Sequence, residues 1–416
     1  MSHAADAVAI APRPDHIREE LVYDFDLFND PALKKDAHAR ILDIARNAPP
    51  VFWSPYNGGQ WFLKSHAAVF KGQRAPEIFA NAPAPIEQIK EMARQRGAEM
   101  LIPAPIAFDA PHHATFRQPI QSAFSPKAMN ALKDDIRALA VELIEAMKPE
   151  GSCEFMSAVA EPLPVQVFLK LFGLPVERQR EYRDLVTEHL ANNSNLDAMA
   201  TQGRLRKVAD VMHDVIIARR DDPKDDLLSY LWKAEFNGEP ATLSDIENYA
   251  VMLFLAGLDT VFNGMGLGVH HLATNPELQA KLRENPKLIP DAAEEILRRY
   301  TFTVPVRFVI QDVEFEGATM KKGERALIFL PAADLDPGEF ESPESFDMAR
   351  ENKVHIAFGT GPHRCLGSHL ARIELQVLYE EMLKRLPEFS LQPDKQITYH
   401  GGNVIGPDEL PLIWQL

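Results

Sequence analysis

The chain has 416 residues, of which 46% are hydrophobic and 25% are charged, and its formal net charge at pH 7 is −16. This composition supplies a large apolar core and predicts a folded globular protein. It disfavours nucleic acid as a partner, because binding to a phosphate backbone generally requires a basic surface. The two cysteines, Cys153 and Cys365, lack the spacing of a secreted disulfide scaffold, which favours a reduced, cytoplasmic setting.

The first 25 residues combine an alanine-rich start with Pro12, Pro14 and several charges. They contain no long apolar segment of the signal-peptide type, so we expect a flexible N-terminal arm over residues 1–25. The longest apolar stretch elsewhere, residues 250–258, is far shorter than the roughly 20 residues of a membrane span. Residues 26–416 are therefore predicted to form one domain that does not contact a membrane.

Strand patterns lie on either side of a predominantly helical middle. Four segments carry distinct signals: a hairpin around Asn57-Gly58-Gly59 that joins residues 51–53 to 61–63, a proline-rich loop at 102–111, a helical pattern from about 127 to 274, and a second strand pair at 304–310 and 326–329. Together they predict a mainly α fold with small β regions.

The longest helix candidate follows a capping box at Ser244-Asp245-Ile246-Glu247, and Asn275-Pro276 marks its end. About 30 residues at 1.5 Å rise would span roughly 45 Å. Residues 249–262 in its middle are apolar on nearly every face, so we expect this helix to be buried.

An acid and an alcohol, Asp259 and Thr260, interrupt this apolar helix, although neither residue favours helix formation. Two interpretations stay open. In the structural one, Thr260 donates to a carbonyl one turn earlier and Asp259 pairs with a distant base. In the functional one, Thr260 holds water and oxygen at a reactive centre, Asp259 supplies protons, and the small Ala256 and Gly257 let a cofactor approach the backbone.

Further along, Glu295 and Arg298 lie three residues apart on a short helix that is predicted to begin near Pro290. Such pairs are commonly solvated and contribute about 0.2–0.5 kcal/mol. A buried pair would instead fix local geometry and be costly to break.

The most specific motif is Phe358-Gly359-Thr360-Gly361-Pro362-His363-Arg364-Cys365-Leu366-Gly367, which directly precedes a helix predicted over 368–386. A helix N-terminus stabilises an anionic sulfur, and the glycines allow a tight turn around a large flat ligand. Cys365 is therefore a candidate thiolate ligand to haem iron.

The order of these motifs, from Ala256-Gly257-Leu258-Asp259-Thr260 through Glu295-x-x-Arg298 to the cysteine motif, resembles the cytochrome P450 family over essentially the whole chain. Within that family the chain is most similar to the soluble bacterial camphor-hydroxylase-like group. The resemblance implies the cytochrome P450 fold, haem b (iron protoporphyrin IX) with Cys365 as its iron ligand, and a monooxygenase that uses Asp259 and Thr260 to manage protons.

The resemblance also assigns cofactor and structural residues. Propionate donors would be His113, Arg117, Arg307 and His363, and further haem contacts would be Ala256, Gly257, Phe358, Gly359 and Gly367. Glu295 and Arg298 would be the structural pair of the fold, joined by Arg350.

Substrate contacts follow by the same resemblance, and most of them are apolar. They are Met100, Leu101, Met252, Leu255, Ala256, Thr303, Val306, Asn403 and Val404. They imply a compact hydrocarbon-like substrate, such as a monoterpenoid or an ionone-like norisoprenoid, with Thr303 or Asn403 contacting one oxygen. The camphor enzyme of the group holds its substrate carbonyl with a loop tyrosine. This chain has no tyrosine between Tyr56 and Tyr182, and Met100 falls nearest to that place, so camphor itself is disfavoured.

No flavin or nucleotide fingerprint and no cysteine cluster appears in the sequence, so electrons are expected from a partner. The resemblance implies a [2Fe-2S] ferredoxin with an NADH-dependent reductase and a monomeric enzyme. The ferredoxin would dock on a basic face formed by Arg117, Lys353, Arg364 and Arg372. The alternative function is a non-catalytic haem-thiolate sensor of gas or redox state.

Overall fold

The computed structural model describes residues 10–95, 100–191 and 198–416. The chain divides into two compact units, and each is described by itself. Unit 1 takes the described parts of Met1–Ala84, Glu295–Arg364 and Thr398–Gly406, whereas unit 2 takes those of Pro85–Glu294, Cys365–Ile397 and Pro407–Leu416. The single domain expected over residues 26–416 stays a prediction.

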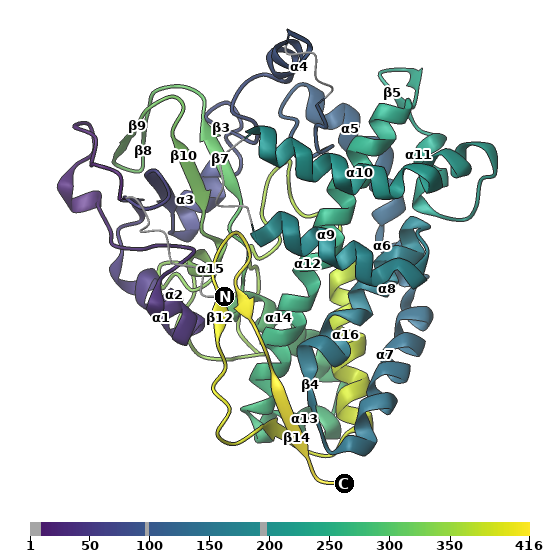
Figure 1. Ribbon diagram of the computed structural model, residues 1–416. Helices are drawn as coiled ribbons and strands as arrows, with labels where there is room; N and C mark the ends of the chain where they lie inside the picture. The colour runs from purple at the N-terminus through teal and green to yellow at the C-terminus, as the bar shows by residue number, and fades with distance from the viewer. Residues whose placement is uncertain (1–9, 96–99, 192–197) are drawn as a thin grey trace, which may run out of the picture. The chain divides into compact units, whose positions relative to one another are not determined.

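Unit 1 is built on a mixed five-stranded sheet in the order β1-β2-β10-β7-β3. The predicted hairpin is confirmed, because β1 (Val51–Ser54) pairs antiparallel with β2 (Gln60–Leu63). The second predicted strand pair is confirmed as β7 (Val306–Val309) against β10 (Arg325–Ile328). The strand β10 also runs parallel to β2, which joins two distant chain segments in one sheet (Figure 1).

Besides β1, β2, β7 and β10, unit 1 contains β3, the last strand of this sheet, and further helices and strands. They are η1 (Glu19–Leu21), α1 (Pro31–Lys35), α2 (Ala37–Asn47), α3 (His66–Gly72), β3 (Phe79–Ala80), the C-terminal part of α14 (Ile289–Arg299), the β8–β9 hairpin (Val313–Phe315 and Ala318–Met320), α15 (Leu330–Ala333), β12 (Tyr399–His400) and β13 (Gly406–Pro407). The β8–β9 hairpin lies between the two predicted strands and was not foreseen. Trp61, Val69 and Ile328 lie in the apolar core of the unit.

Part of the N-terminal arm departs from the expectation that residues 1–25 are flexible. Residues 1–9 lie outside the described part of the chain, but residues 10–25 pack against β1. The Tyr23 N–H donates to the Trp53 carbonyl at 2.9 Å, and Ile17 and Phe25 are fully buried. The apolar residues of this segment are too few to predict a packed segment from periodicity, yet they complete the core of unit 1.

Unit 2 is predominantly helical and centres on the predicted long helix, α12 (Leu243–Ala273). The helix begins earlier than predicted, because Thr242 and Asp245 form the capping box instead of Ser244 and Glu247. The Asp245 N–H donates to Thr242 Oγ1 at 3.2 Å, and the Thr242 N–H donates to Asp245 Oδ2 at 3.0 Å. By length and composition alone α12 could cross a membrane, but within unit 2 it is packed as a core helix.

The other elements of unit 2 pack around α12 or flank it (Figure 1). They are α4 (Ile86–Gln95), α5 (His112–Gln121), η2 (Ser122–Phe124), α6 (Pro126–Asn130), α7 (Lys133–Met147), η3 (Lys148–Glu150), β4 (Ser152–Glu154), the π-helical turn η4 (Met156–Ala160), α8 (Pro162–Phe172), η5 (Val176–Arg178), α9 (Gln179–Ala191), α10 (Ala198–Asp221), α11 (Leu227–Trp232), the β5–β6 hairpin (Glu235–Phe236 and Glu239–Pro240), α13 (Pro276–Glu284), η6 (Pro286–Leu288), the first part of α14, α16 (Ser368–Arg385), β11 (Phe389–Leu391) and β14 (Pro411–Trp414).

The helix predicted after the cysteine motif is confirmed as α16, which packs against α7. Cys153 lies on β4, which pairs with β14. Burial raises the pKa of the Cys153 thiol to about 12, so this cysteine is protonated and unreactive. Neither Cys153 nor Cys365 forms a disulfide.

Candidate functional site

In unit 1 the backbone before the cysteine is fixed against Gln73, the residue that follows α3. The Thr360 N–H donates to Gln73 Oε1 at 2.8 Å. Gly359 and Gly361 have φ values of 71° and 69°, and a Cβ added at Gly361 would lie 2.6 Å from the Gln73 carbonyl oxygen. These glycines are therefore required by backbone conformation and by a close backbone approach.

Asp334, at the end of α15, holds the start of the same segment. Its Oδ1 accepts from the Ile356 N–H at 2.9 Å, and its Oδ2 accepts from the Thr301 hydroxyl at 2.7 Å. The residue is fully buried, and this burial raises the pKa of its carboxyl group. Asp334 joins the end of α14 to the approach of the cysteine motif, a role that sequence reasoning did not foresee.

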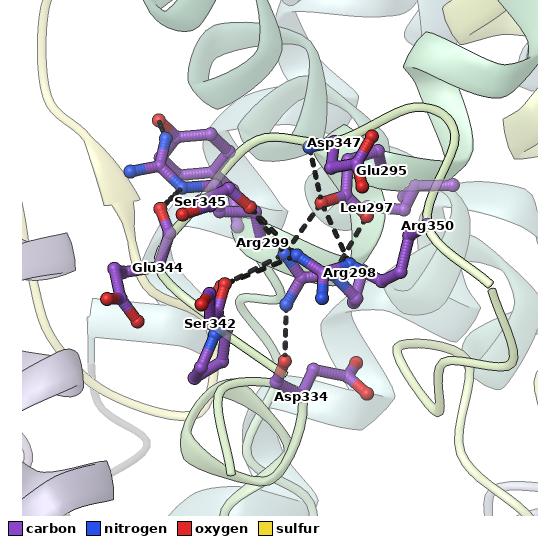
Figure 2. A network of polar contacts seen from close by, with 12 residues as sticks. Glu295, Leu297, Arg298, Arg299, Asp334, Ser342, Glu344, Ser345, Asp347 and Arg350 are labelled. Carbon is purple, nitrogen blue, oxygen red and sulfur yellow. Dashed lines mark hydrogen bonds and ion pairs between the residues drawn. The ribbon is translucent and has the colours of Figure 1, made fainter. Parts of the chain in front are cut away.

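Glu295 and Arg298 form a buried bidentate ion pair in unit 1. The two N···O distances are 2.8 Å, and Arg298 is only 1% exposed. The remaining Arg298 donors bond to carbonyl oxygens, including that of Asp334 at 2.8 Å, as Figure 2 shows. Arg350 Nε lies 3.4 Å from Glu295 Oε1, so the expected third member joins the network.

Four predicted substrate positions occur on two neighbouring segments of unit 1. Thr303 and Val404 form an isolated antiparallel bridge, and the Val304 N–H donates to the Asn403 carbonyl at 2.8 Å. Asn403 Nδ2 donates to the Val304 carbonyl at 2.9 Å. One N–H of this amide is therefore used by the backbone, whereas Thr303 is half-buried and its hydroxyl makes no hydrogen bond to the described backbone.

The other predicted residues of unit 1 are placed as follows. Arg307 lies on β7, is 5% exposed and donates to the Val306 carbonyl at 2.9 Å. Phe358 and His363 are half-buried in the turns of the cysteine motif.

In unit 2, Cys365 is exposed and stands just before α16. The N-cap of α16 is Gly367, which donates no side-chain cap, and a Cβ added there would meet nothing within 4 Å. The N-terminus of an 18-residue helix and the open space at Gly367 suit an anionic sulfur beside a bulky ligand.

One stripe of α12 is less buried than the rest of its middle. The stripe consists of the half-buried residues Asn248, Met252, Leu255, Ala256 and Thr260, which recur at helical spacing; Gly257, Val261 and Phe262 are half-buried outside it. Their neighbours Val251, Phe254 and Leu258 are almost completely buried. The expectation that the whole middle of the helix is buried is therefore wrong. The stripe places four predicted site residues on one face of α12.

The acid-alcohol pair lies at the end of this stripe. Thr260 Oγ1 donates to the Ala256 carbonyl at 2.9 Å, which is the bond that the structural interpretation anticipated. The side chain of Asp259 lies outside the described part of the chain. Gly257 has a different role from the expected cofactor approach, because a Cβ added there would overlap the ring of Phe168 on α8. Its small size serves helix packing.

The predicted donors His113 and Arg117 lie four residues apart on α5 and share one face. His113 is 7% exposed and Arg117 is half-buried. The helix is attached to α12, because the Tyr249 hydroxyl donates to the Phe116 carbonyl at 2.5 Å.

The predicted loop over residues 102–111 is confirmed, and it is attached to two helices. Leu101, a predicted substrate contact, exchanges two hydrogen bonds with the side chain of Gln202 on α10, both at 3.0 Å. The Ile102 N–H donates to Asn248 Oδ1 at 2.7 Å. Met100 is half-buried next to this attachment. Sequence reasoning missed Gln202 and Asn248, because polar residues on helices carry no local signal of a loop partner.

Of the proposed basic face, Arg372 is already occupied. Its Nε and Nη2 bind Glu294 at 2.7 and 2.9 Å, so its charge is locally neutralised. Lys353 and Arg364 are exposed, and they belong to unit 1.

These donors fit a haem. A solvent-accessible cysteine at a helix N-terminus suits an iron ligand, and the cationic and imidazole donors on α5 and β7 suit propionate carboxylates. Cys365, His113 and Arg117 of unit 2 would hold the group, and Arg307 of unit 1 stays a predicted propionate donor.

Comparison with known proteins supports haem as the cofactor. A family model described as Cytochrome P450 matches residues 202–406. The chain is 31% identical over 412 residues to a probable cytochrome P450 127A1 of Sinorhizobium fredii, with 97% of each chain covered. It is 32% identical over 360 residues to the steroid C26-monooxygenase of Mycobacterium tuberculosis, covering 84% of this chain and 93% of the relative. The crystal structure of CYP101J2 superposes with a TM-score of 0.86 at 31% identity and covers 98% of this chain and all of the other.

Proposed function

The chain belongs to the cytochrome P450 family, and from this premise we propose that it hydroxylates a compact, mostly hydrocarbon terpenoid or ionone-like norisoprenoid with electrons from a ferredoxin. The family makes it a monooxygenase that carries haem b. The substrate, the electron donor and a cytoplasmic location are the parts that we add.

One observation carries the proposed substrate class: the half-buried stripe of α12 is apolar along most of its length. Met252, Leu255 and Ala256 supply only hydrocarbon and thioether surface. The attached loop adds Leu101, which is 3% exposed. Burial of apolar ligand surface against these side chains stabilises binding by roughly 25 cal/mol per Å². It offers few polar groups to orient a heavily oxygenated ligand.

A single substrate oxygen has one favoured contact. Thr303 has a hydroxyl, and no hydrogen bond from that hydroxyl to the backbone is described, whereas Asn403 already uses one N–H for Val304. We therefore assign a carbonyl or hydroxyl of the substrate to Thr303. The steroid named for the Mycobacterium tuberculosis relative is the larger alternative substrate class.

When bound, the haem supplies oxygen activation, with Cys365 as its thiolate ligand. The chain contributes proton handling through Thr260. Its hydroxyl donates to the Ala256 carbonyl, which leaves the oxygen lone pairs to accept a proton donor such as water. Asp259 is the residue that we assign to supply the proton.

Electron transfer needs a partner, and we assign a [2Fe-2S] ferredoxin with its reductase. Arg117, Lys353 and Arg364 are the basic residues proposed for its acidic surface. Arg372 is a weaker candidate than its sequence position implied, because Glu294 binds its guanidinium.

The test is turnover of a panel of monoterpenoids, norisoprenoids and steroids by the haem-loaded protein with ferredoxin, reductase and NADH. We expect hydroxylated products from the small terpenoids. Hydroxylation of steroids alone would contradict the substrate class. No product from any ligand that shifts the haem spectrum would favour the sensor. The CO-bound reduced protein should show the red-shifted Soret band of thiolate ligation, and Cys365→His should lose it.

Met100 gives a sharper test of the substrate surface. Met100→Tyr introduces a phenol beside Leu101, and we expect tighter binding of camphor-like ketones by about three- to tenfold, because one added hydrogen bond contributes about 1 kcal/mol. Met100→Phe adds the ring without the hydroxyl and is the control. Equal affinities for the two variants would show that residue 100 does not contact the ketone.

A further inference from the structure

We propose that Gln202 and Asn248 are positioning residues that clamp the backbone of residues 101–104 and thereby control how fast ligands reach the haem. The inference rests on the proposed function only in taking this loop as part of the substrate site. Neither residue was among the predicted site positions, and both belong to unit 2 with the loop that they hold.

Gln202 binds the loop as a neighbouring β-strand would. Its Oε1 accepts from the Leu101 N–H, and its Nε2 donates to the Leu101 carbonyl, each at 3.0 Å. One carboxamide therefore satisfies both backbone polar groups of a residue that is 97% buried. Buried backbone groups are costly to leave unpaired, so this carboxamide stabilises the backbone at Leu101.

Asn248 fixes the next residues against α12. Its Oδ1 accepts from the Ile102 N–H at 2.7 Å, and its carbonyl accepts from the Ala104 N–H at 3.3 Å. Asn248 lies one turn before Met252 on the half-buried stripe. The hydrogen bonds of Gln202 and Asn248 thus fix the position of Leu101 relative to the stripe, and they do so without a bound substrate.

The two anchors are held at a fixed spacing. Glu247, next to Asn248 on α12, lies 3.3 Å from Arg206 Nη1 and 3.0 Å from His213 Nδ1, and both of these residues are on α10. Glu247 is 7% exposed. Because α10 carries Gln202, the ion pair with Arg206 and the hydrogen bond with His213 tie the two halves of the clamp to one another.

The far end of the loop is attached by different chemistry. Phe108 stacks on Phe116 with ring centroids 4.2 Å apart, and Phe116 stacks on Phe236 at 5.4 Å. Phe236 stacks on Tyr249 of α12 at 5.3 Å. This aromatic stack buries apolar surface, and the bond from the Tyr249 hydroxyl to the Phe116 carbonyl joins α12 to α5 rather than to the loop. Movement of the loop therefore starts at the clamp, where neutral hydrogen bonds exchange with water at little net cost.

Hydrogen exchange of the ligand-free holoprotein tests the clamp without reference to any substrate. In Gln202→Leu the amides of Leu101, Ile102 and Ala104 should exchange at least tenfold faster, because two hydrogen bonds of about 1 kcal/mol each are lost. Asn248→Leu should accelerate exchange at Leu101 as well as at Ile102. The control is Gln392→Leu, which removes a comparable bond from a half-buried glutamine to the Leu412 carbonyl. Unchanged exchange at residues 101–104 would overturn the clamp.

The functional part is tested by the binding of 4-phenylimidazole to the ferric haem in stopped-flow experiments. Association and dissociation rate constants should both rise about three- to tenfold in Gln202→Leu, while the dissociation constant and the CO-bound spectrum change little. Equal rates in this variant and in Gln392→Leu would show that the clamp does not control access. Gln202→Glu places a charged oxygen against the Leu101 carbonyl and should give the same acceleration if Gln202→Leu does not fold. Because this ligand binds iron directly, a wrong substrate class would leave these results intact.

Discussion

The approach to the cysteine in unit 1 and the loop at residues 100–104 in unit 2 are both irregular backbone, but different chemistry holds them. In unit 1 a buried Glu295–Arg298 pair and the carboxyl group of Asp334 occupy the carbonyl and amide groups around the segment. In unit 2 the neutral amides of Gln202 and Asn248 perform the equivalent task. Charge is used in the segment that leads to the proposed haem ligand, Cys365.

The energetic difference explains this use. Removing one partner of a buried ion pair costs about 3–5 kcal/mol, because the other charge is left uncompensated. A neutral hydrogen bond contributes about 0.5–1.5 kcal/mol net, since water substitutes for either partner. The segment that approaches Cys365 is therefore expected to keep one conformation. The loop near the substrate stripe is expected to open and close, because its hydrogen bonds can be replaced by water. The following variants test this difference, in order of decreasing expected effect on stability.

The largest effect is expected for Arg298→Leu. The substitution leaves Glu295 buried without Arg298 and removes the donor that three carbonyl groups share, so we expect a loss of about 3–5 kcal/mol of stability and a loss of haem retention. Thermal unfolding of the holoprotein and its haem content measure this. Arg94→Leu, at an exposed position on α4, is the control. A similar unfolding temperature for the two variants would contradict the charge-built frame.

A smaller loss of stability is expected when the packing between α8 and α12 in unit 2 is disturbed. Gly257→Ala should destabilise by about 1–3 kcal/mol, because the new methyl group overlaps Phe168 in a close-packed interface. At Gly203 on α10 nothing lies within 4 Å, so Gly203→Ala should stabilise by about 0.5–1 kcal/mol through helix propensity. Denaturant unfolding compares the pair. Stabilisation by both substitutions would refute the tight α8–α12 contact.

Glu374 is the exception in unit 2, a buried acid on α16 whose Oε2 has no partner. Burial raises the pKa of this carboxyl group from 4.5 to about 8. The native state then keeps a proton that the unfolded chain releases, so the stability contribution is full below about pH 4.5 and is lost as pH rises toward about 8.

Glu374→Gln removes this titration, so the unfolding temperature of the variant relative to the parent protein should rise between pH 5 and pH 8 by a few degrees, roughly the shift that 1 kcal/mol produces. Glu87→Gln makes the same charge change at an exposed site and is the control. A pH-independent difference would show that Glu374 titrates normally.

The smallest effect on stability is expected for Thr260→Ala. Its hydroxyl bonds a carbonyl that already serves the helix, so the loss should stay within about 0.5 kcal/mol, as for most substitutions away from special features. Substrate binding should persist while hydroxylated product per NADH falls and hydrogen peroxide rises. Product yield is compared with Thr274→Ala, a threonine with the same type of backbone bond at the end of α12. Equal product yields for the two variants would show that Thr260 does not take part in proton transfer.

Local turn and capping chemistry made much of the fold predictable. The hairpin around Asn57 and the helix after Cys365 follow from residues next to each other in sequence. The start of α12 shows the limit. Thr242-x-x-Asp245 and Ser244-x-x-Glu247 both match a capping box, and the second is excluded because Glu247 binds Arg206 and His213.

Contacts between distant elements could not be predicted. Gly257 was expected to face a cofactor, and only the position of α8 reveals that Phe168 occupies that space. Gln202 and Asn248 look like ordinary polar helix residues until the loop is placed against them. The partner of Arg372 was missed for the same reason, since Glu294 lies on another helix.

The parallel pairing of β2 with β10 has a consequence during synthesis. Trp61 emerges from the ribosome early, but its strand neighbour Ala326 follows only after most of the chain has been made. The apolar hairpin of β1 and β2 therefore waits with an unpaired edge while the helices of unit 2 are translated. Closing so long a segment is slow, and it makes this edge the place where a nascent chain needs protection from aggregation.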